Sequence, residues 1–567
     1  MGRTLVTLAI AGFWALPLAA APAPSLLDIL SDELQRNFTV LKQKADPPPY
    51  YMDYTVTDEE SQSVTAMMGT LESQRKNRLR YLDITLRVGT PELDNYHQVN
   101  GQRGRFTRGD VLSLDDVPDA IRRQVWLATD RTYKLASRRL IEIKSNRETK
   151  VKEADSSADF SSEPPSVYQE PPPAMAGVDN EWVKRVRKWS ADVAKSPDVL
   201  YSRVNLSVQR ISKYMVSTDG TRLLHGRDFA GLSMEARGKA TDGMDLRAEE
   251  NFQASDAAHL PPQAVIDAAA SRVAENLTKL VQAPAVEPFV GPAILSGGAA
   301  AVFFHEIFGH RIEGHRQKDE GEGQTFTKAV GAPVLPSFLS VLFDPTRRTM
   351  GGVELNGYYT YDDEGVKGRP VTVVENGVLK TFLMSRSPID GVDHSNGHGR
   401  RQPGLEVVSR QSNLIVESTK QVSEQALRGM LMAEIKRQNK PYGLLFDEVT
   451  GGYTTTQRRG LQAFTVIPLM VYRVFTDGRP DELVRGVDIV GTPLASFSKI
   501  LATSDTPQVF NGYCGAESGQ VPVSAISPAV LVSEIEIQKK QHSQDRLPFL
   551  GRPADLVARP LDQGASQ

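Results

Sequence analysis

Hydrophobic residues recur at helical spacing in some stretches of the chain and alternate with polar residues in others. Residues 25–41 place four leucines at helical spacing and begin with a serine, a residue type that caps helices. Residues 200–211 alternate between apolar and polar side chains, as in a strand with one buried face. These patterns predict a protein that mixes helices with strands.

The same patterns predict elements along most of the chain. The further predicted helices cover residues 117–143, 179–194, 262–281, 296–310 and 423–437. The further predicted strands cover residues 50–57, 63–71, 80–88, 371–375, 378–384 and 463–475. Asn376-Gly377 and Asp477-Gly478 predict tight hairpin turns. The expected fold class is α+β, with N-terminal α/β regions followed by a large C-terminal domain that is rich in antiparallel sheet and carries the helix 296–310.

The length of 567 residues is too great for one core and indicates roughly three domains. Residues 153–177 are rich in serine, proline and acidic residues, which predicts an exposed linker or insertion. The predicted divisions are an N-terminal α/β domain with an insertion (22–152), this linker, a central α/β domain (178–285), a C-terminal domain (286–542) and a polar tail (543–567).

The first 21 residues combine one positive charge, a short apolar run and the small residues Ala19-Ala20-Ala21. This order is typical of a secretory signal peptide, and the run is shorter than the roughly 20 apolar residues that a membrane span needs. We therefore expect an exported protein, periplasmic or extracellular, without a stable membrane span.

Composition narrows the possible functions. With 66 basic and 69 acidic residues the net charge is −3, which argues against nucleic acid as the main partner. The single cysteine, Cys514, excludes an intramolecular disulfide and any zinc site built on two cysteines of one chain.

The strongest chemical signal is a His-Glu-x-x-x-His sequence at residues 305–310, at the end of an apolar, alanine-rich segment. Burying two imidazoles and a carboxylate costs several kcal/mol unless they are paired or bind a metal. His305 and His310 are five residues apart, which would separate them by about 140° on an ideal helix. We therefore expect a π-bulge near Gly309 that brings the two rings to one face.

Two histidines are too few for a catalytic zinc site, which uses three protein ligands and one open position. Glu313, His315, a distant carboxylate and Cys514 are all candidates for the third ligand. Because His315 stands beside Glu313, it is more typical of a supporting or surface pair than of a ligand. Glu306 is the candidate general base toward a water that the metal activates.

The motifs in residues 285–540 together resemble the TldD/PmbA family of zinc peptidases, and specifically its metal-bearing TldD-like subunit. They lie at residues 305–310, at Asp362-Asp363-Glu364-Gly365, at Gly397–Pro403, at Arg485–Gly491 and at Cys514–Ser524. The resemblance implies that His305, His310 and Cys514 bind Zn²⁺ and that Glu306 is the catalytic base.

The resemblance also implies partners. Members of the family act on short or unfolded peptides, held as an added strand, and form homodimers or heterodimers with a metal-less sister subunit. The expected function is therefore zinc-dependent hydrolysis of such peptides. The alternative is a non-catalytic peptide-binding or partner subunit, against which the intact motif argues. A zinc-thiolate redox sensor built on Cys514 is a third, weaker hypothesis.

Overall fold

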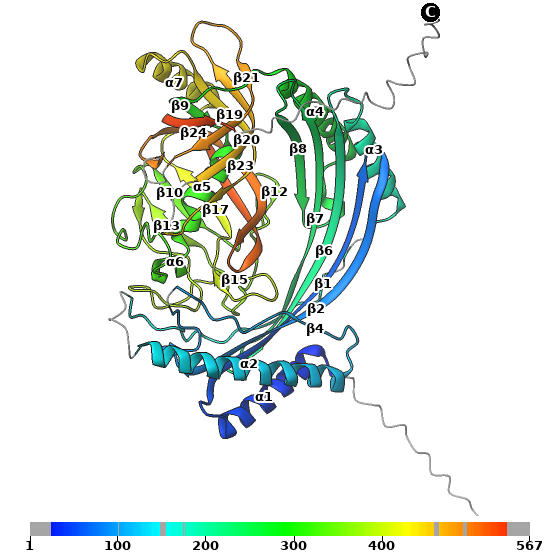
Figure 1. The fold of residues 1–567 in the computed structure, drawn as a ribbon, viewed down its shortest axis with the longest axis vertical. Coiled ribbons are helices and arrows are strands. Elements are labelled where there is room, and N and C mark those ends of the chain that lie inside the picture. The colour runs from blue at the N-terminus through cyan, green and yellow to red at the C-terminus, as the bar shows by residue number, and fades with distance from the viewer. Residues whose placement is uncertain are drawn as a thin grey trace, which may run out of the picture.

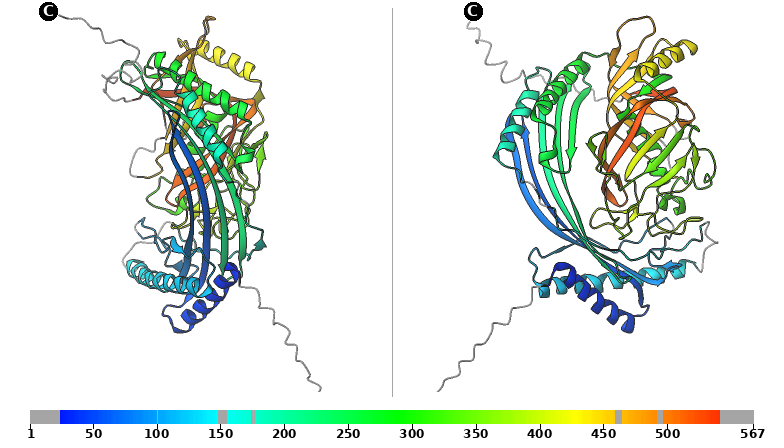
Figure 2. Two further views of the ribbon diagram at one scale, coloured as in Figure 1. Left: turned by 90° about the vertical axis from the view of Figure 1, so that its right-hand side faces the viewer. Right: turned by 180° about the vertical axis from the view of Figure 1, so that it is seen from behind.

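The computed structural model describes residues 24–99, 101–147, 155–173, 175, 177–458, 464–491 and 496–540. The predicted signal segment 1–21 and the predicted tail 543–567 lie outside these ranges. A curved sheet of very long strands wraps one side of a C-terminal body that is built on a second sheet (Figures 1 and 2). The α+β class expected from the sequence is confirmed.

The predicted helices are present with ends close to those expected. The described helices are α1 (Leu26–Lys44), α2 (Pro118–Arg147), α3 (Asn180–Val193), α4 (Gln263–Gln282), α5 (Gly297–Ile307), the single turn α6 (His315–Lys318) and α7 (Glu424–Arg437). Side-chain caps explain several of the starts, because they satisfy N–H groups that have no partner within a helix. Ser25 forms a capping box with Asp28, and Asp179, Ser296 and Ser423 cap α3, α5 and α7.

The N-terminal sheet is built from four long antiparallel strands. Its members are β1 (Pro49–Met67), β2 (Thr70–Thr90), β3 (Leu93–Asp94), β4 (Asp110–Leu112), β5 (Val167–Gln169), β6 (Tyr201–Ser217), β7 (Arg222–Lys239) and β8 (Asp245–Ala254). Pairing runs β3-β2-β1-β6-β7-β5, with β4 on β2 and β8 on β7. The helices α1 and α2 pack at one end of this sheet, and α3 and α4 pack at the other (Figure 1).

One expectation about the strands of this half is wrong. The strand predicted at 50–57 and most of the one predicted at 63–71 form a single strand, β1, which turns into β2 after Met67. The polar residues between the two predicted strands are paired across the sheet: Glu60 accepts a 2.6 Å bond from Arg210 of β6. The predicted N-terminal and central domains also share one sheet, since β1 pairs with β6 over the whole span from Asp53 to Met67. A backbone ladder of this length joins the two regions into one structural unit.

The serine- and proline-rich segment 153–177 is not simply an exposed linker. Its described part buries Phe160, whose ring lies 4.8 Å from that of Tyr51 and beneath the guanidinium of Arg386 at 4.1 Å. The carbonyl of Ser161 accepts two hydrogen bonds from Arg386, and β5 pairs with β7. One aromatic anchor and a short strand pairing therefore attach this segment to the N-terminal sheet and to Arg386 of the C-terminal body.

The C-terminal body is organised by a twelve-stranded mixed sheet. Its strands are β9 (Phe289–Leu295), β10 (Leu339–Phe343), β13 (Val371–Glu375), β14 (Val378–Leu379), β17 (Asn413–Ser418), β18 (Gln421–Val422), β19 (Gly443–Thr454), β20 (Phe464–Val474), β21 (Glu482–Val484), β22 (Val487–Val490), β23 (Ile500–Ala516) and β24 (Gly519–Lys539). Two small ribbons, β11 (Thr349–Met350) with β12 (Val353–Glu354) and β15 (Gly399–Arg400) with β16 (Val408–Ser409), complete it. The hairpin predicted at Asn376-Gly377 is confirmed, although its second strand is only two residues long.

The helix α5 lies buried at the centre of this body. It packs against β24, β19, β23 and β20, and nearly every one of its residues is inaccessible to solvent. A helix that is apolar on all sides, with three phenylalanines close together at Phe303, Phe304 and Phe308, has to lie inside a core. None of the helices in the described ranges is long and apolar enough to cross a membrane.

We predict that Phe160→Ala lowers the free energy of unfolding by about 3 kcal/mol, because it removes a buried aromatic ring and its packing against Arg386. Urea unfolding followed by tryptophan fluorescence measures the change. Val167→Ala is the matched control in the same segment, since Val167 is 72% exposed and its loss should cost less than about 0.5 kcal/mol. Equal effects of the two substitutions would show that Phe160 does not anchor the segment.

Candidate metal centre

The chemistry-bearing end of α5 is positioned by close packing at both ends of the helix. At its start Ser296 accepts a hydrogen bond from the Ala299 N–H, and a Cβ on Gly297 would lie 2.7 Å from the carbonyl of Ser527 in β24. The last turn of the helix carries His305 and Glu306 into the interior of the body.

The helix ends between the two histidines, so the predicted π-bulge is wrong. Phe308 terminates α5 with a bond of 3.0 Å from its N–H to the Phe304 carbonyl, and residues Gly309–Ile312 continue as a 3₁₀ turn. This tighter turn brings the imidazole of His310 to 5.2 Å from that of His305, with the rings at 81°. Gly309 does lie at this irregularity, and a side chain there would collide with Gln411.

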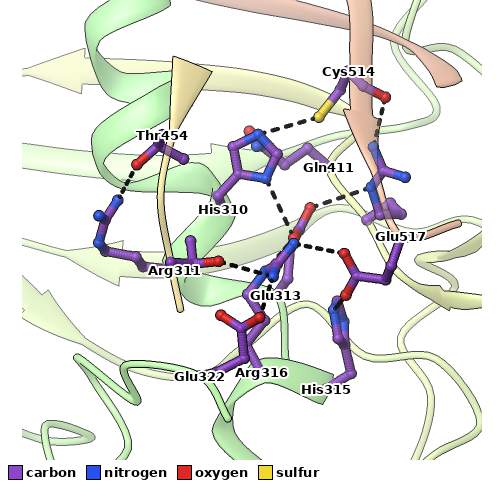
Figure 3. Close-up of polar contacts among 12 residues, drawn as sticks. His310, Arg311, Glu313, His315, Arg316, Glu322, Gln411, Thr454, Cys514 and Glu517 are labelled. Carbon is purple, nitrogen blue, oxygen red and sulfur yellow. Dashed lines mark hydrogen bonds and ion pairs between the residues drawn. The ribbon is translucent and has the colours of Figure 1, made fainter. Parts of the chain in front are cut away.

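Cys514 reaches the same point from a distant part of the chain. It belongs to β23, which forms a hairpin with β24, and its Sγ lies 3.4 Å from Nε2 of His310. The ligand atoms of His305, His310 and Cys514 all lie within 4.8 Å of one another, and all three residues are buried. Arg410 holds the Cys514 backbone through a 2.6 Å hydrogen bond to its carbonyl. Figure 3 shows the sulfur of Cys514 pointing toward the His310 ring.

The electrostatics of the cluster favour a thiolate. Burial alone would raise the pKa of the Cys514 thiol, but His310, His305 and Arg410 together hold it well below its usual value. Burial would likewise lower the pKa of His310, yet Cys514 and Glu313 raise it well above the ordinary value. The thiolate is the form that binds metals, and a bound cation would take the place of the positive charge that His310 otherwise supplies.

Glu306 faces the same cluster without being part of the ligand set. Its Oε2 lies 3.9 Å from Nε2 of His310, and burial raises its pKa. The strand β19 approaches it closely at Gly452, where a Cβ would lie only 2.7 Å from Cγ of Glu306. Because Gly452 has no side chain, the backbone of β19 leaves room for the side chain of Glu306.

Glu313 supports His310 from behind. It is fully buried, and its carboxylate lies 3.4 Å from Nδ1 of His310 and 2.9 Å from Nε of Arg316. Burial alone would raise the pKa of Glu313, but His310 and Arg316 lower it to about 2. A carboxylate on the far nitrogen of a ligating histidine orients the ring and raises its basicity, so Glu313 is a support and not a ligand.

His315 also falls outside the ligand cluster. It is buried, not on the surface, and its Nε2 pairs with Glu517 just beyond Cys514. Burial lowers the pKa of His315 to about 4. Arg316 bridges Glu517 at 3.0 Å and Glu322 at 3.0 Å, so this network joins the 310–322 segment to the β23–β24 hairpin (Figure 3).

The structure also places Arg410 and Gln411, to which no sequence pattern assigned a role, directly at the cluster. Arg410 is completely buried between the Cys514 carbonyl and Glu313, at 3.4 Å from the Glu313 carboxylate. Gln411 donates toward the carbonyl of His305 at 3.4 Å. In the sequence, Arg410 and Gln411 stand shortly before the apolar strand β17, where polar residues ordinarily predict a solvent-exposed loop. Their position next to a buried strand was the only signal.

Two cavities open onto the cluster from different directions. One has a volume of about 940 Å³ and the other about 870 Å³, and both are lined by His305, Glu306, Gly452 and Tyr513. The edges of β19 and β23 border them: in the described chain β19 pairs with β9 only over Leu444–Phe446, and β23 pairs with β18 only over two residues. Within the described residues, both strand edges therefore lack a neighbouring strand for much of their length beside the candidate centre.

These donors fit a metal ion. Imidazole nitrogens and thiolates both bind zinc, and a catalytic zinc site uses three protein ligands and leaves a fourth position open. Here Glu306 and the two cavities lie where such an open position has to be. The fold and the site thus define a class of protein in which a buried His-His-Cys cluster faces a cavity. The cluster lies next to a carboxylate and could hold a metal.

Comparison with known proteins agrees with this class. Residues 290–539 match the PmbA/TldA metallopeptidase C-terminal domain. A metalloprotease of Archaeoglobus fulgidus is 27% identical over 272 residues, covering 47% of this chain and 57% of the relative. A zinc metalloprotease TldD homolog of Saccharolobus solfataricus is 26% identical over 278 residues, covering 47% and 56%.

The fold extends the likeness beyond the aligned sequences. The crystal structure of TldE from Thermococcus kodakarensis superimposes with a TM-score of 0.60 at 14% identity, over 90% of this chain and all of that chain. Residues 290–539 thus form a C-terminal domain similar to that of the PmbA/TldA metallopeptidases, and the fold of the whole chain is like that of TldE. In sequence the chain spans about half the length of the curated relatives it matches.

We predict that zinc-reconstituted, dialysed protein retains about one metal ion per chain, and that His310→Ala and Cys514→Ala each lose it because one of three donors is gone. Inductively coupled plasma mass spectrometry gives the stoichiometry, and circular dichroism checks folding. His394→Ala is the control, since this histidine is 70% exposed and remote from the cluster. Full zinc content in folded Cys514→Ala protein would contradict the assignment of the thiolate.

Proposed function

We propose that this protein is a zinc-dependent peptidase that hydrolyses peptide bonds in short or unfolded peptides. The observation that carries the proposal is the convergence of His305, His310 and Cys514 beside Glu306, at a point reached by two cavities. The domain match to metallopeptidases and the zinc metalloprotease among the relatives support the choice of reaction and metal.

Each residue has a defined task in this proposal. His305, His310 and Cys514 would hold the zinc ion, which supplies a Lewis acid that polarises the scissile carbonyl and lowers the pKa of a water molecule. Glu306 accepts the proton of the attacking water on its carboxylate and later delivers it to the leaving amine. Glu313 keeps the His310 ring in place through Nδ1.

The strand edges provide the binding mode. A peptide that adds to the exposed edge of β19 or β23 forms main-chain hydrogen bonds and is therefore read mainly by its backbone. The pairing of β19 with β20 is irregular between Phe446 and Gly451, next to the larger cavity. Such bulges bend a strand and redirect its free groups, which suits an edge that receives substrate. Only an extended chain can bind this way, so folded proteins are excluded as substrates.

Two further properties belong to the proposal and rest on the sequence pattern and the family. We propose that residues 1–21 direct export to the periplasm or beyond, which N-terminal sequencing of the mature protein would test. We also propose that the protein works as a dimer, either with itself or with a metal-less sister subunit. Light scattering of the purified chain, alone and with a co-expressed sister subunit, distinguishes these assemblies.

We predict that Glu306→Gln keeps the zinc ion but lowers kcat for an unfolded peptide by about 10²- to 10⁴-fold, because the proton acceptor is lost while its size is preserved. Glu320→Gln is the control, since Glu320 is exposed and should leave turnover unchanged. Metal analysis accompanies the kinetics.

Two results would overturn parts of this proposal. Undiminished turnover in Glu306→Gln would remove the general-base role. Metal-replete wild-type protein that binds peptides and cleaves none, alone or with a sister subunit, would instead support a non-catalytic partner subunit.

We predict that N-methylation of alternate backbone nitrogens in a cleavable peptide lowers kcat/KM at least tenfold, because a strand added to an edge needs its N–H donors. Alanine substitutions of the side chains at the same positions should change kcat/KM less. Rapid cleavage of the N-methylated peptide would show that the substrate is not bound as a strand.

A further inference from the structure

A third cavity, separate from the two at the metal cluster, lies between the N-terminal sheet and the β23–β24 hairpin. Its volume is about 260 Å³, and we call it the tyrosine–arginine cavity, for Tyr358, Tyr359, Tyr361, Tyr513, Arg227 and Arg400, which line it. Tyr513 also lines both cavities of the metal cluster and directly precedes Cys514. The tyrosine–arginine cavity therefore adjoins the centre at which cleavage is proposed.

Two guanidinium groups in this cavity have no acidic partner. Arg227 of β7 donates to the carbonyl of Asn356 at 2.7 Å, and Arg400 donates to the carbonyl of Gln411 at 2.6 Å. Both also lie over aromatic rings, at 5.7 Å from Phe229 for Arg227 and 4.7 Å from Tyr359 for Arg400. Within the ranges that the structure describes, neither arginine forms an ion pair.

Three carboxyl groups line the cavity, and each already accepts a hydrogen bond: Glu59 accepts one from the side-chain amide of Gln209. Asp363 pairs with Lys213 and accepts the Arg401 backbone N–H at 2.8 Å. Asp362 accepts three backbone N–H groups, and burial together with Glu364 raises its pKa well above the ordinary value.

Four cationic side chains line the cavity (Lys213, Arg227, Arg400 and Arg401) against these three carboxyl groups, so the lining has an excess of positive charge. Burial, with a further contribution from the charge of Arg400, lowers the pKa of Arg227 to about 10, so Arg227 remains protonated near neutral pH. Uncompensated buried cations are costly, and an anion that enters between them would relieve this cost.

The chemistry of the walls defines the anion. Paired guanidinium groups bind carboxylates through parallel hydrogen bonds, and the tyrosine rings offer apolar faces to whatever carries the carboxylate. The volume lies just below the roughly 300–1,000 Å³ of ordinary small-molecule sites, which suits one or two amino-acid residues. A peptide at the neighbouring metal cluster can supply such a group.

We propose that the tyrosine–arginine cavity binds a carboxylate of the substrate peptide, either its C-terminal carboxylate or an acidic side chain, through Arg227 and Arg400. This inference rests on the proposed peptidase function and adds a preference to it: strand addition reads the backbone, and the two arginines select for a negative charge at one position. Arg227 acts as a specificity residue, since it binds the substrate without contacting the reacting atoms.

The test measures binding without turnover. Zinc-loaded Glu306→Gln protein is titrated calorimetrically with the peptide Ala-Ala-Phe-Ala-Ala-Ala in two forms, with a free C-terminus and with a C-terminal amide. A second pair carries glutamate or glutamine in place of the alanine before the phenylalanine, with the C-terminus amidated. We expect the charged member of at least one pair to bind about tenfold more tightly, as for a hydrogen-bonded charge.

Variants of Arg227 assign that difference to the cavity. Arg227→Gln should abolish the preference for the charged peptide, and Arg227→Lys should restore part of it. Arg237→Gln is the matched control, because Arg237 lies on the same strand β7, is exposed and pairs with Glu235 outside the cavity. Arg400 is less suitable for the first test, since its contact with Gln411 lies next to the metal cluster and its loss can disturb folding.

The outcomes separate the two proposals. A preference in the first pair identifies the C-terminal carboxylate and a preference in the second identifies an acidic side chain, provided that Arg227→Gln removes it. Equal binding of charged and uncharged peptides, or a preference that survives Arg227→Gln, overturns the inference. A charge preference that depends on Arg227 in a protein whose wild type cleaves no peptide would instead keep the inference and reject the peptidase function.

Discussion

The structure depends on the burial of two imidazoles, a thiol and a carboxylate in the most apolar part of the molecule. Groups of this kind are stable in a core only when each has a partner, and here the partners come from several distant segments. Glu313 holds His310, while Arg410 holds both the Cys514 backbone and Glu313. The cluster is therefore supported before any metal is considered, which gives the precise placement that a ligand site requires.

The same constraint explains the local backbone. The helix α5 has to end after Ile307 so that His310 can turn back toward His305, and the 3₁₀ turn after it accomplishes this. The strand β19 can approach Glu306 only at a residue without a side chain, which is Gly452. Next to the cluster, β19 and β23 have edges without a neighbouring strand, and two cavities remain open. In an ordinary protein core this space would be filled by side chains.

The N-terminal sheet completes the site from the opposite side. Residues of β8 line the larger cavity at the cluster, and residues of β6 and β7 line the tyrosine–arginine cavity. Neither cavity could be formed by the C-terminal body alone. Phe160 packs against Tyr51 of this sheet and against Arg386 of the body, so it connects the two halves that together line these cavities.

Local sequence determined the secondary structure wherever short-range chemistry decides it. The serine and aspartate caps, the helical spacing of the leucines in α1 and the turn at Asn376-Gly377 all act over a few residues, so they could be predicted. The same holds for the types of donor in the metal cluster, since a buried histidine pair with a glutamate limits the possible chemistry. The resemblance of several motifs to one family also pointed to His305, His310, Cys514 and Glu306, but it did not give their geometry.

Tertiary structure alone decided how these parts meet. Cys514 lies 204 residues from His310, and its sulfur reaches the ring only because the β23–β24 hairpin packs beside the end of α5. The polar middle of β1 was predicted as a break, yet it continues as a strand because β6 supplies the pairing charges. Arg227 carries no signal in the sequence, since its meaning depends on which acidic groups are absent around it. Such relations involve residues far apart in the chain, and only the packed fold brings their charges within reach of one another.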